Sequence, residues 1–172
     1  MKSFRIVLGD ITTMEVDVIV NAANTSLLGG AGVDGAIHHA AGPNLLKECR
    51  TLNGCETGQA KITRGYRLPA KYVIHTPGPI WQGGGHHESE LLRDCYRNSL
   101  QLAEDHTCWT VAFPSISTGV YHYPLEQGAA IAVRAIHEFL ATSKYVEQVY
   151  MVCFDPSTEE IYEKAETQYP TL

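Results

Sequence analysis

Short runs of hydrophobic residues alternate along this chain with longer stretches in which hydrophobic residues recur at helical spacing. The short runs are rich in Val, Ile, Tyr and Phe, as is typical of strands that are covered on both faces. We therefore predict strands at residues 4–8, 17–20, 59–63, 72–75, 110–113 and 148–154. The helical spacing predicts helices at residues 33–41, 88–104, 125–140 and 157–165.

This alternation favours an α/β fold, a three-layer α/β/α sandwich around a mixed, mostly parallel sheet. The 172 residues fit a single domain over residues 1–172, with no repeat or linker, and roughly 70% of the unfolded surface can be buried. We expect residues 168–172 to fray. We interpret the glycine- and histidine-containing segment at residues 82–87 as slack, that is, as a flexible surface connection, with an insertion near the site as the alternative.

Composition narrows the class of protein. Hydrophobic residues make up 44% and charged residues 19% of the chain, and no run approaches the roughly 18 apolar residues of a membrane span. The N-terminal apolar run is interrupted by Asp10, so we expect no secretory signal and a cytoplasmic location. The net charge of −6 argues against a strong grip on nucleic acid, which needs clustered Lys and Arg. We expect a monomer.

Cysteines and histidines indicate neither a metal site nor a cofactor. The five cysteines are odd in number and form no C-x-x-C pair, so we interpret them as reduced, buried thiols. The pairs His38-His39 and His86-His87 lack Glu or Cys at ligand spacing, and adjacent helical residues point about 100° apart. A cysteine nucleophile acting with His75 is the weaker alternative, because no cysteine has a recognisable activating environment.

A polar, glycine-rich segment follows the strand predicted at residues 17–20. It contains Asn21 and Asn24, then Gly29-Gly-Ala-Gly32, and then Asp34 at the start of a predicted helix. Glycines can turn backbone N–H groups inward, and a helix start adds unpaired N–H donors and a positive dipole end. The segment therefore predicts an anion-binding loop. Asp34 either caps the helix or faces a bound sugar or a water.

Residues 30–35 also match the pattern G-x-G-x-x-G of dinucleotide-binding proteins. In that motif the first glycine follows its strand directly, whereas here the predicted strand ends well before Gly30. No acidic residue closes a second strand about 20 residues later. We therefore reject a nicotinamide-dependent enzyme.

A second small-residue loop, Pro114-Ser-Ile-Ser-Thr-Gly-Val-Tyr121, joins the strand at residues 110–113 to the helix at 125–140. Ligands of open α/β sheets bind beyond the carboxyl ends of the strands, so both loops should lie on one rim. Two phosphate-binding loops on one rim imply a diphosphate ligand. A plain β-to-α turn is the alternative for this second loop.

Six motifs, in order, resemble the macrodomain family, and specifically its MacroD-type branch, which includes bacterial O-acetyl-ADP-ribose deacetylases. They are Gly9-Asp10-Ile11-Thr12, Asn21-Ala-Ala-Asn24, residues 29–38, His75-Thr-Pro-Gly-Pro79, the loop at 114–121 and Val152-Cys-Phe-Asp155. The resemblance covers nearly the whole chain. It departs at Ala31, where the branch usually has glycine; if that position needs a positive φ or a close approach to phosphate, alanine costs about 1 kcal/mol of affinity.

The resemblance implies a hydrolase that removes acyl groups from O-acetyl-ADP-ribose or cleaves mono-ADP-ribose esters from acidic side chains. Asp34 orients or deprotonates water and Asn24 fixes the hydroxyls of the distal ribose, although a phosphate oxygen of the substrate is an alternative proton acceptor. Its partners are ADP-ribose and the O-acyl or protein-linked derivatives. The competing function is a non-catalytic ADP-ribose reader, which could lack the pair of Asn24 and Asp34.

The resemblance also implies where the nucleotide binds. Asp10 accepts a hydrogen bond from the adenine amino group beside the backbone of Ile11, and Phe154 lies against the adenine ring. The two loops hold the diphosphate, and Tyr121 forms one wall of the pocket for the distal ribose. The full set of ligand-binding residues comprises Asp10, Ile11, Asn21, Ala22, Gly29, Gly30, Ala31, Gly32, Val33, Ser115, Ile116, Ser117, Thr118, Gly119, Val120, Tyr121 and Phe154.

Overall fold

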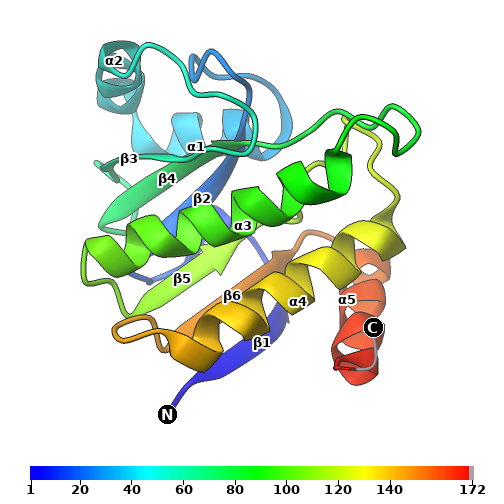
Figure 1. Ribbon diagram of the computed structural model, residues 1–172. Helices are drawn as coiled ribbons and strands as arrows, with labels where there is room; N and C mark the ends of the chain where they lie inside the picture. The colour runs from blue at the N-terminus through cyan, green and yellow to red at the C-terminus, as the bar shows by residue number, and fades with distance from the viewer. Residues whose placement is uncertain (171–172) are drawn as a thin grey trace.

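The computed structural model describes residues 1–170 and contains a six-stranded sheet with the strand order β1-β6-β5-β2-β4-β3 (Figure 1). Every neighbouring pair is parallel except β3 with β4, which is antiparallel. The predicted mixed, mostly parallel sheet is therefore confirmed. The strands are β1 (Ser3–Leu8), β2 (Val18–Ala23), β3 (Lys61–Arg64), β4 (Tyr72–Pro77), β5 (Thr110–Phe113) and β6 (Gln148–Cys153).

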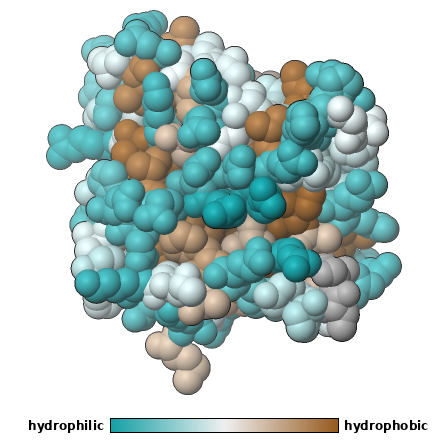
Figure 2. Space-filling model, viewed as in Figure 1, coloured by the Kyte–Doolittle hydropathy of each residue, from teal (hydrophilic) through white to brown (hydrophobic). Residues whose placement is uncertain are grey.

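Helices cover both faces of the sheet, so the three-layer arrangement is confirmed as well (Figure 1). One face carries α1 (Gly32–Ala41) and α2 (Pro43–Thr51). The other carries α3 (Glu88–Asp105), α4 (Leu125–Thr142) and α5 (Pro156–Gln168). Hydrophilic side chains dominate the surface over α3 and α4 (Figure 2). None of the helices in residues 1–170 is both long and apolar enough to cross a membrane.

The helix α2 and a short 3-10 helix, η1 (Ile11–Thr13), were not predicted from the sequence. The nine residues of α2 bury only Leu45 and Cys49, so its hydrophobic pattern is too sparse to stand out. The signal available in the sequence was the pair Gly42-Pro43, because Pro is favoured in the first turn of a helix and Gly tolerates a positive φ just before it. In the structure Pro43 occupies the first turn of α2 and Gly42 has a φ of 85°.

The prediction that the chain frays from residue 168 is wrong for the residues described. Gln168 is the last residue of α5, and the ring of Tyr169 stacks on His137 with the centroids 4.5 Å apart. An aromatic ring packed in this way fixes the end of the helix. Residues 171–172 lie outside the described part of the chain.

The central strand β2 positions the site. Its residues are almost all buried, and successive side chains point to opposite faces, so Ile19, Asn21 and Ala23 face α1. Asn21 is a fully buried polar residue on this face. The parallel register with β4 sets Asn21 beside His75. Because β2 also pairs with β5, the loops that follow these two strands emerge side by side.

Candidate functional site

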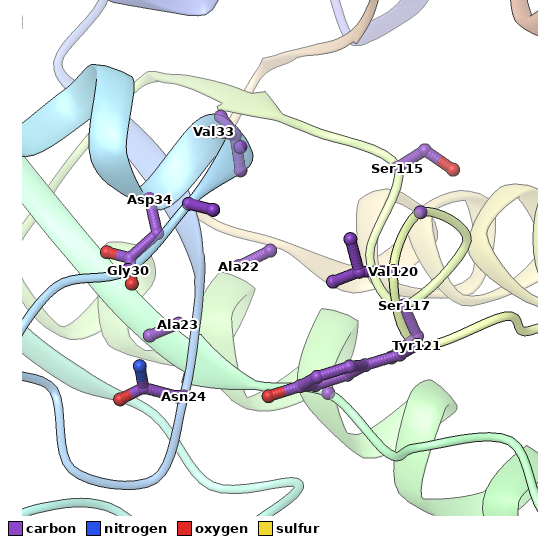
Figure 3. Close-up of a pocket in the computed structure, with 14 residues that line it drawn as sticks. Ala22, Ala23, Asn24, Gly30, Val33, Asp34, Ser115, Ser117, Val120 and Tyr121 are labelled. Atoms are coloured by element: carbon purple, nitrogen blue, oxygen red, sulfur yellow. The ribbon is translucent and has the colours of Figure 1, made fainter.

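A cavity of about 380 Å³ opens where β2 and β5 end. One wall is the Asn24 loop, residues 24–31 between β2 and α1, together with the start of α1. The opposite wall is the Ser117 loop, residues 114–124 between β5 and α4. Figure 3 shows Asp34 and Asn24 on one side, and Ser117, Val120 and Tyr121 on the other. The lining comprises residues 22–24, 30–34, 78, 115, 117 and 119–121.

The Asn24 loop is held in shape by the side chain of Asn24 itself. Its Nδ2 donates to the carbonyl oxygen of Gly29 over 2.8 Å, and its Oδ1 accepts from the backbone N–H of Leu27 over 3.1 Å. Gly29 has a φ of +91°, a conformation that glycine adopts without strain. Asn24 therefore both organises the loop and lines the cavity.

The start of α1 lies directly against the cavity. Ala31 is the N-cap residue, and Gly32, Val33 and Asp34 form the first turn, whose backbone N–H groups have no partner within the helix. The positive end of the helix dipole and these N–H groups favour an anion. Ala31 has a φ of −94°, so the alanine takes an ordinary extended conformation and the expected penalty from a positive φ does not arise. A cost from a close approach to phosphate stays a prediction.

Burial and a hydrogen bond from the core side fix the side chain of Asp34. It is 5% exposed, and its Oδ1 accepts a hydrogen bond of 2.8 Å from Nδ2 of Asn21. Nε2 of His38, one helical turn along, lies 3.4 Å from the same oxygen. The other oxygen, Oδ2, lies beside Gly30, where a Cβ would come within 3.1 Å of it. The interpretation of Asp34 as a capping residue is not supported, because its carboxylate accepts its hydrogen bond from Asn21 and not from a backbone N–H group of α1.

The hydrogen bonds behind Asp34 continue through His75. Nδ2 of Asn21 also lies 3.2 Å from Nδ1 of His75, and Nε2 of His75 lies 3.0 Å from Oγ1 of Thr63. Because the Asn21 amide donates one hydrogen to each neighbour, His75 accepts at Nδ1 and carries its proton at Nε2. Desolvation, reinforced by His38, lowers the pKa of His75 to about 3, so the ring is neutral near pH 7.

The same geometry argues against a cysteine nucleophile. Sγ of Cys49 lies 3.8 Å from Nε2 of His75, but burial and then Asp34 raise the pKa of its thiol to about 11. A thiol that stays protonated at neutral pH is a weak nucleophile. All five cysteines are free and buried, as predicted. Within residues 1–170, no three His, Cys, Asp or Glu side chains form a group that could hold a metal ion.

The Ser117 loop is tied to the core on its far side. The hydroxyl of Ser115 is hydrogen-bonded to Thr118 at 2.6 Å and to Tyr162 at 2.7 Å. The backbone N–H of Ile116 donates to the hydroxyl of Tyr96, so this amide is already paired inside the core. Ser117 itself takes a left-handed conformation with a φ of 66°. These contacts fix the loop and leave Ser117 and residues 119–121 facing the cavity.

Gly78 and Ala23 line the cavity but were not predicted as site residues. Gly78 has a specific steric role, because a Cβ there would lie 2.1 Å from Oγ of Ser117. Glycine therefore allows the end of β4 and the Ser117 loop to pack together. The signal in the sequence was a glycine set between Pro77 and Pro79 just after a predicted strand.

Part of the predicted ligand set lies outside this cavity. Asp10 caps η1, accepting hydrogen bonds at Oδ1 from the backbone N–H and the hydroxyl of Thr12. Phe154 is 91% exposed. The register of β1 with β6 brings Asp10 and Phe154 to the ends of neighbouring strands. The predicted residues that do not line the cavity are Asp10, Ile11, Asn21, Gly29, Ile116, Thr118 and Phe154.

The Trp81 loop, residues 78–87 between β4 and α3, is ordered rather than slack, so that prediction is wrong. The buried carboxylate of Glu88 accepts hydrogen bonds from the backbone N–H groups of Gln82, Gly84 and His86. Although desolvation opposes ionisation, these donors prevail and lower the pKa of Glu88 to about 2. The backbone N–H of Trp81 donates to the carbonyl oxygen of Tyr121 over 2.9 Å. The loop is thereby fastened to the wall of the cavity.

Fold and site together define an α/β protein in which two loops and a helix start surround an open cavity suited to an anionic ligand. The sequence model of the family described as Macro domain matches residues 20–132. The chain belongs to this family.

Curated relatives extend over almost the whole chain. A macro domain-containing protein of Chlorobaculum tepidum is 64% identical over 156 residues, which are 91% of each chain. A Klebsiella pneumoniae protein named O-acetyl-ADP-ribose deacetylase is 54% identical over 170 residues, covering 96% of this chain and 97% of the relative. The chain is thus similar both to a named deacetylase and to proteins named only for their domain.

Solved structures share the fold. A variant of the Oceanobacillus iheyensis macrodomain, determined with ADPR, has a TM-score of 0.90 and 47% identity, covering 95% of this chain and 91% of its own. The Trypanosoma brucei macrodomain in complex with ADP-ribose has a TM-score of 0.88 and 44% identity, covering 94% of this chain and 68% of its own. The macrodomain fold expected from the sequence is therefore confirmed.

Proposed function

We propose that this protein binds ADP-ribose in the cavity of about 380 Å³ and hydrolyses an ester on its distal ribose. The observation that carries the proposal is the placement of Asp34, a buried carboxylate fixed by Asn21 beside the cavity wall formed by Asn24. Relatives named O-acetyl-ADP-ribose deacetylase and solved macrodomains with ADP-ribose support the same assignment.

The nucleotide would run along the rim from the end of β1 to Asn24. At the adenine end, Asp10 accepts from the amino group beside Ile11, and the exposed ring of Phe154 offers an apolar surface for stacking. The diphosphate lies between the first turn of α1 and the Ser117 loop, where backbone N–H groups meet it without any Lys or Arg among the lining residues. The distal ribose then reaches Asn24 and Asp34.

The reaction needs a positioned water and a group to take its proton. In O-acetyl-ADP-ribose, the water oxygen bonds to the acyl carbon and the bond from that carbon to the ribose oxygen breaks. Asp34, or a phosphate oxygen of the substrate, takes the proton of the water, and a proton ends on the ribose oxygen. Acetic acid and ADP-ribose result. Backbone N–H groups of the loops stabilise the negative charge that develops on the acyl oxygen.

The same groups serve a mono-ADP-ribose ester of an acidic side chain, because that substrate presents a similar ester at the same ribose. A reader that only binds ADP-ribose is the competing function, since a fold does not establish catalysis. The combination of Asn24 with a core-anchored Asp34 at one cavity favours the hydrolase.

Turnover of O-acetyl-ADP-ribose and affinity for ADP-ribose test the proposal together. We expect Asp34→Ala to abolish turnover while the ADP-ribose Kd stays within about tenfold, or about 1.4 kcal/mol. Asp105→Ala, which removes an exposed carboxylate at the end of α3, is the matched control and should leave both unchanged. Full turnover by Asp34→Ala removes Asp34 from the mechanism, and binding without turnover by the unmodified protein identifies a reader.

A further inference from the structure

A second cavity, of about 270 Å³, lies next to the first. The two cavities share Asn24, Gly78 and Tyr121 in their linings, so these residues form the boundary between them. In Figure 3 the hydroxyl of Tyr121 is directed toward Asn24 across this boundary. The second cavity therefore begins at the side chain to which the proposed function assigns the distal ribose.

The outer rim of the second cavity is the Trp81 loop, and this rim has a fixed position. Three backbone N–H groups of the loop converge on the buried carboxylate of Glu88. The ring of Trp81 packs on Tyr123 at a centroid distance of 4.8 Å, and a Cβ at Gly84 would come within 3.1 Å of the Trp81 ring. With the Trp81 N–H bonded to Tyr121, the loop and the boundary residue form one unit.

The second cavity is larger than an acetyl group requires. At about 30 Å³ for each water molecule, a volume of about 270 Å³ corresponds to roughly nine waters, whereas an acetyl group displaces only a few. A cavity of this size on the far side of the ester fits an amino acid side chain with part of its backbone.

The lining of the second cavity favours a polypeptide over a nucleic acid. Thr25, Thr57 and Gln82 offer hydroxyl and amide groups that can pair with peptide N–H and C=O groups, and Leu91 adds an apolar surface. No Lys or Arg is among the lining residues, and the backbone N–H groups of Gln82, Gly84 and His86 in the rim are already bonded to Glu88. These N–H groups are therefore not available to the phosphates of a polynucleotide end, unlike the backbone N–H groups of the first cavity. Glu88 adds no free acceptor, because its carboxylate is occupied by the loop.

We propose that the second cavity binds the peptide segment that carries ADP-ribose on an acidic side chain, so that the scissile ester lies at the boundary between Asn24 and Tyr121. This inference rests on the proposed function and extends it, because it assigns the part of the substrate that leaves. It makes residues 57 and 82 determinants of specificity for the protein-linked ester, with no role in cleavage of the acetyl ester.

Filling the second cavity tests the inference. Thr57→Trp adds bulk to its lining at a position outside the proposed catalytic and nucleotide-binding set. The full chain and its variants would be assayed with O-acetyl-ADP-ribose, with a synthetic peptide bearing ADP-ribose on a glutamate ester, and with an oligonucleotide bearing ADP-ribose on its terminal phosphate. Thr167→Trp, an exposed position on α5, is the matched control. Gln82→Trp repeats the test if Thr57→Trp fails to fold.

We expect Thr57→Trp to lower kcat/KM for the peptide ester by about tenfold or more, which is about 1.4 kcal/mol, while acetyl-ester turnover and ADP-ribose affinity stay within about threefold. Equal effects on the two esters, or no effect on either, would overturn the inference and leave the proposed function intact. A larger loss with the oligonucleotide than with the peptide would overturn the choice of partner. Absence of turnover of any ester by the unmodified protein would refute the proposed function itself.

Discussion

Nδ2 of Asn21 donates a hydrogen bond of 2.8 Å to Oδ1 of Asp34, joining the buried strand β2 to the first turn of α1. A carboxylate at a helix start usually caps the helix, and here the bond from Asn21 turns it toward the core and the cavity wall instead. His75 holds the same amide from the other side. Hydrogen bonds within the protein therefore fix the orientation of the proposed catalytic carboxylate without a ligand.

Replacing Asn21 should weaken both the fold and the reaction. Asn21→Leu leaves the Asp34 carboxylate buried without its donor, so we expect the free energy of unfolding to fall by about 1–3 kcal/mol. We expect turnover of O-acetyl-ADP-ribose to fall more than ADP-ribose affinity, since Asp34 loses its orientation. Urea denaturation and steady-state kinetics measure the two effects, and Asn44→Leu on the exposed surface of α2 is the control. Unchanged turnover in Asn21→Leu would show that Asp34 needs no such support.

His75 should make stability depend on pH. Its pKa is about 3 in the folded protein and near 6.5 in the unfolded chain, so the unfolded state binds the proton between these values. The contribution of His75 to the free energy of unfolding is therefore fully present above pH 6.5 and decreases as the pH falls toward 3. At pH 5 the loss relative to pH 7.5 is about 2 kcal/mol.

The measurement is urea denaturation at pH 7.5 and pH 5, a range above the titration of Glu88. We expect His75→Gln to lose most of this pH dependence, whereas His39→Gln, which removes an exposed histidine of α1, retains it. The same slope in all three proteins would mean that another group accounts for the acid sensitivity.

Much of the architecture could be predicted from the sequence, because strands buried on both faces give nearly continuous apolar runs. Within residues 1–170, all six strands and four of the helices were predicted, and the two loops meet at one cavity as expected from the rule for parallel sheets. The short helix α2 was missed since its buried residues are too few to set a period. The hydrogen bond between Asn21 and Asp34 could not be predicted, because it depends on how α1 packs on β2.

Glu88 should control the order of the Trp81 loop. Glu88→Gln replaces a charged acceptor of three backbone hydrogen bonds by a neutral amide, so we expect hydrogen exchange at Gln82, Gly84 and His86 to accelerate by about tenfold or more. Glu90→Gln, which removes only an exposed contact to His87, is the control. Because the pKa of Glu88 is lowered to about 2, its contribution is present above pH 4.5 and is lost as the pH falls toward 2. Unaltered exchange in Glu88→Gln would contradict this role.

The Trp81 loop also marks a limit of sequence reasoning. Its glycines and histidines have the composition of a mobile connection, and nothing in the residue pattern indicates that the carboxylate after the loop accepts three of its amides. The composition of a segment indicates only how flexible that segment would be in isolation. A buried hydrogen-bond acceptor at its end can hold it in one conformation. The glycine between Pro77 and Pro79 could be noticed in the sequence, but its contact with Ser117 depends on how two distant loops pack.

The adenine end of the proposed site gives a separate prediction. Asp10→Ala removes the acceptor assigned to the adenine amino group and the cap of η1, so we expect ADP-ribose affinity to fall by about 1–3 kcal/mol. Isothermal titration calorimetry measures the change, and Glu15→Ala is the control at a nearby acidic position outside the proposed site. Equal affinity in Asp10→Ala and the unmodified protein would mean that the nucleotide has the opposite orientation or another location.

The central claim is that the start of α1 and the Ser117 loop enclose a diphosphate and so bring the distal ribose to Asp34. A crystal structure of the protein with ADP-ribose measures this directly. We predict phosphate oxygens within hydrogen-bonding distance of backbone N–H groups in both the first turn of α1 and the Ser117 loop, with the distal ribose beside Asn24 and Asp34. A diphosphate bound outside the cavity between these two walls, or a distal ribose remote from Asp34, would contradict the claim.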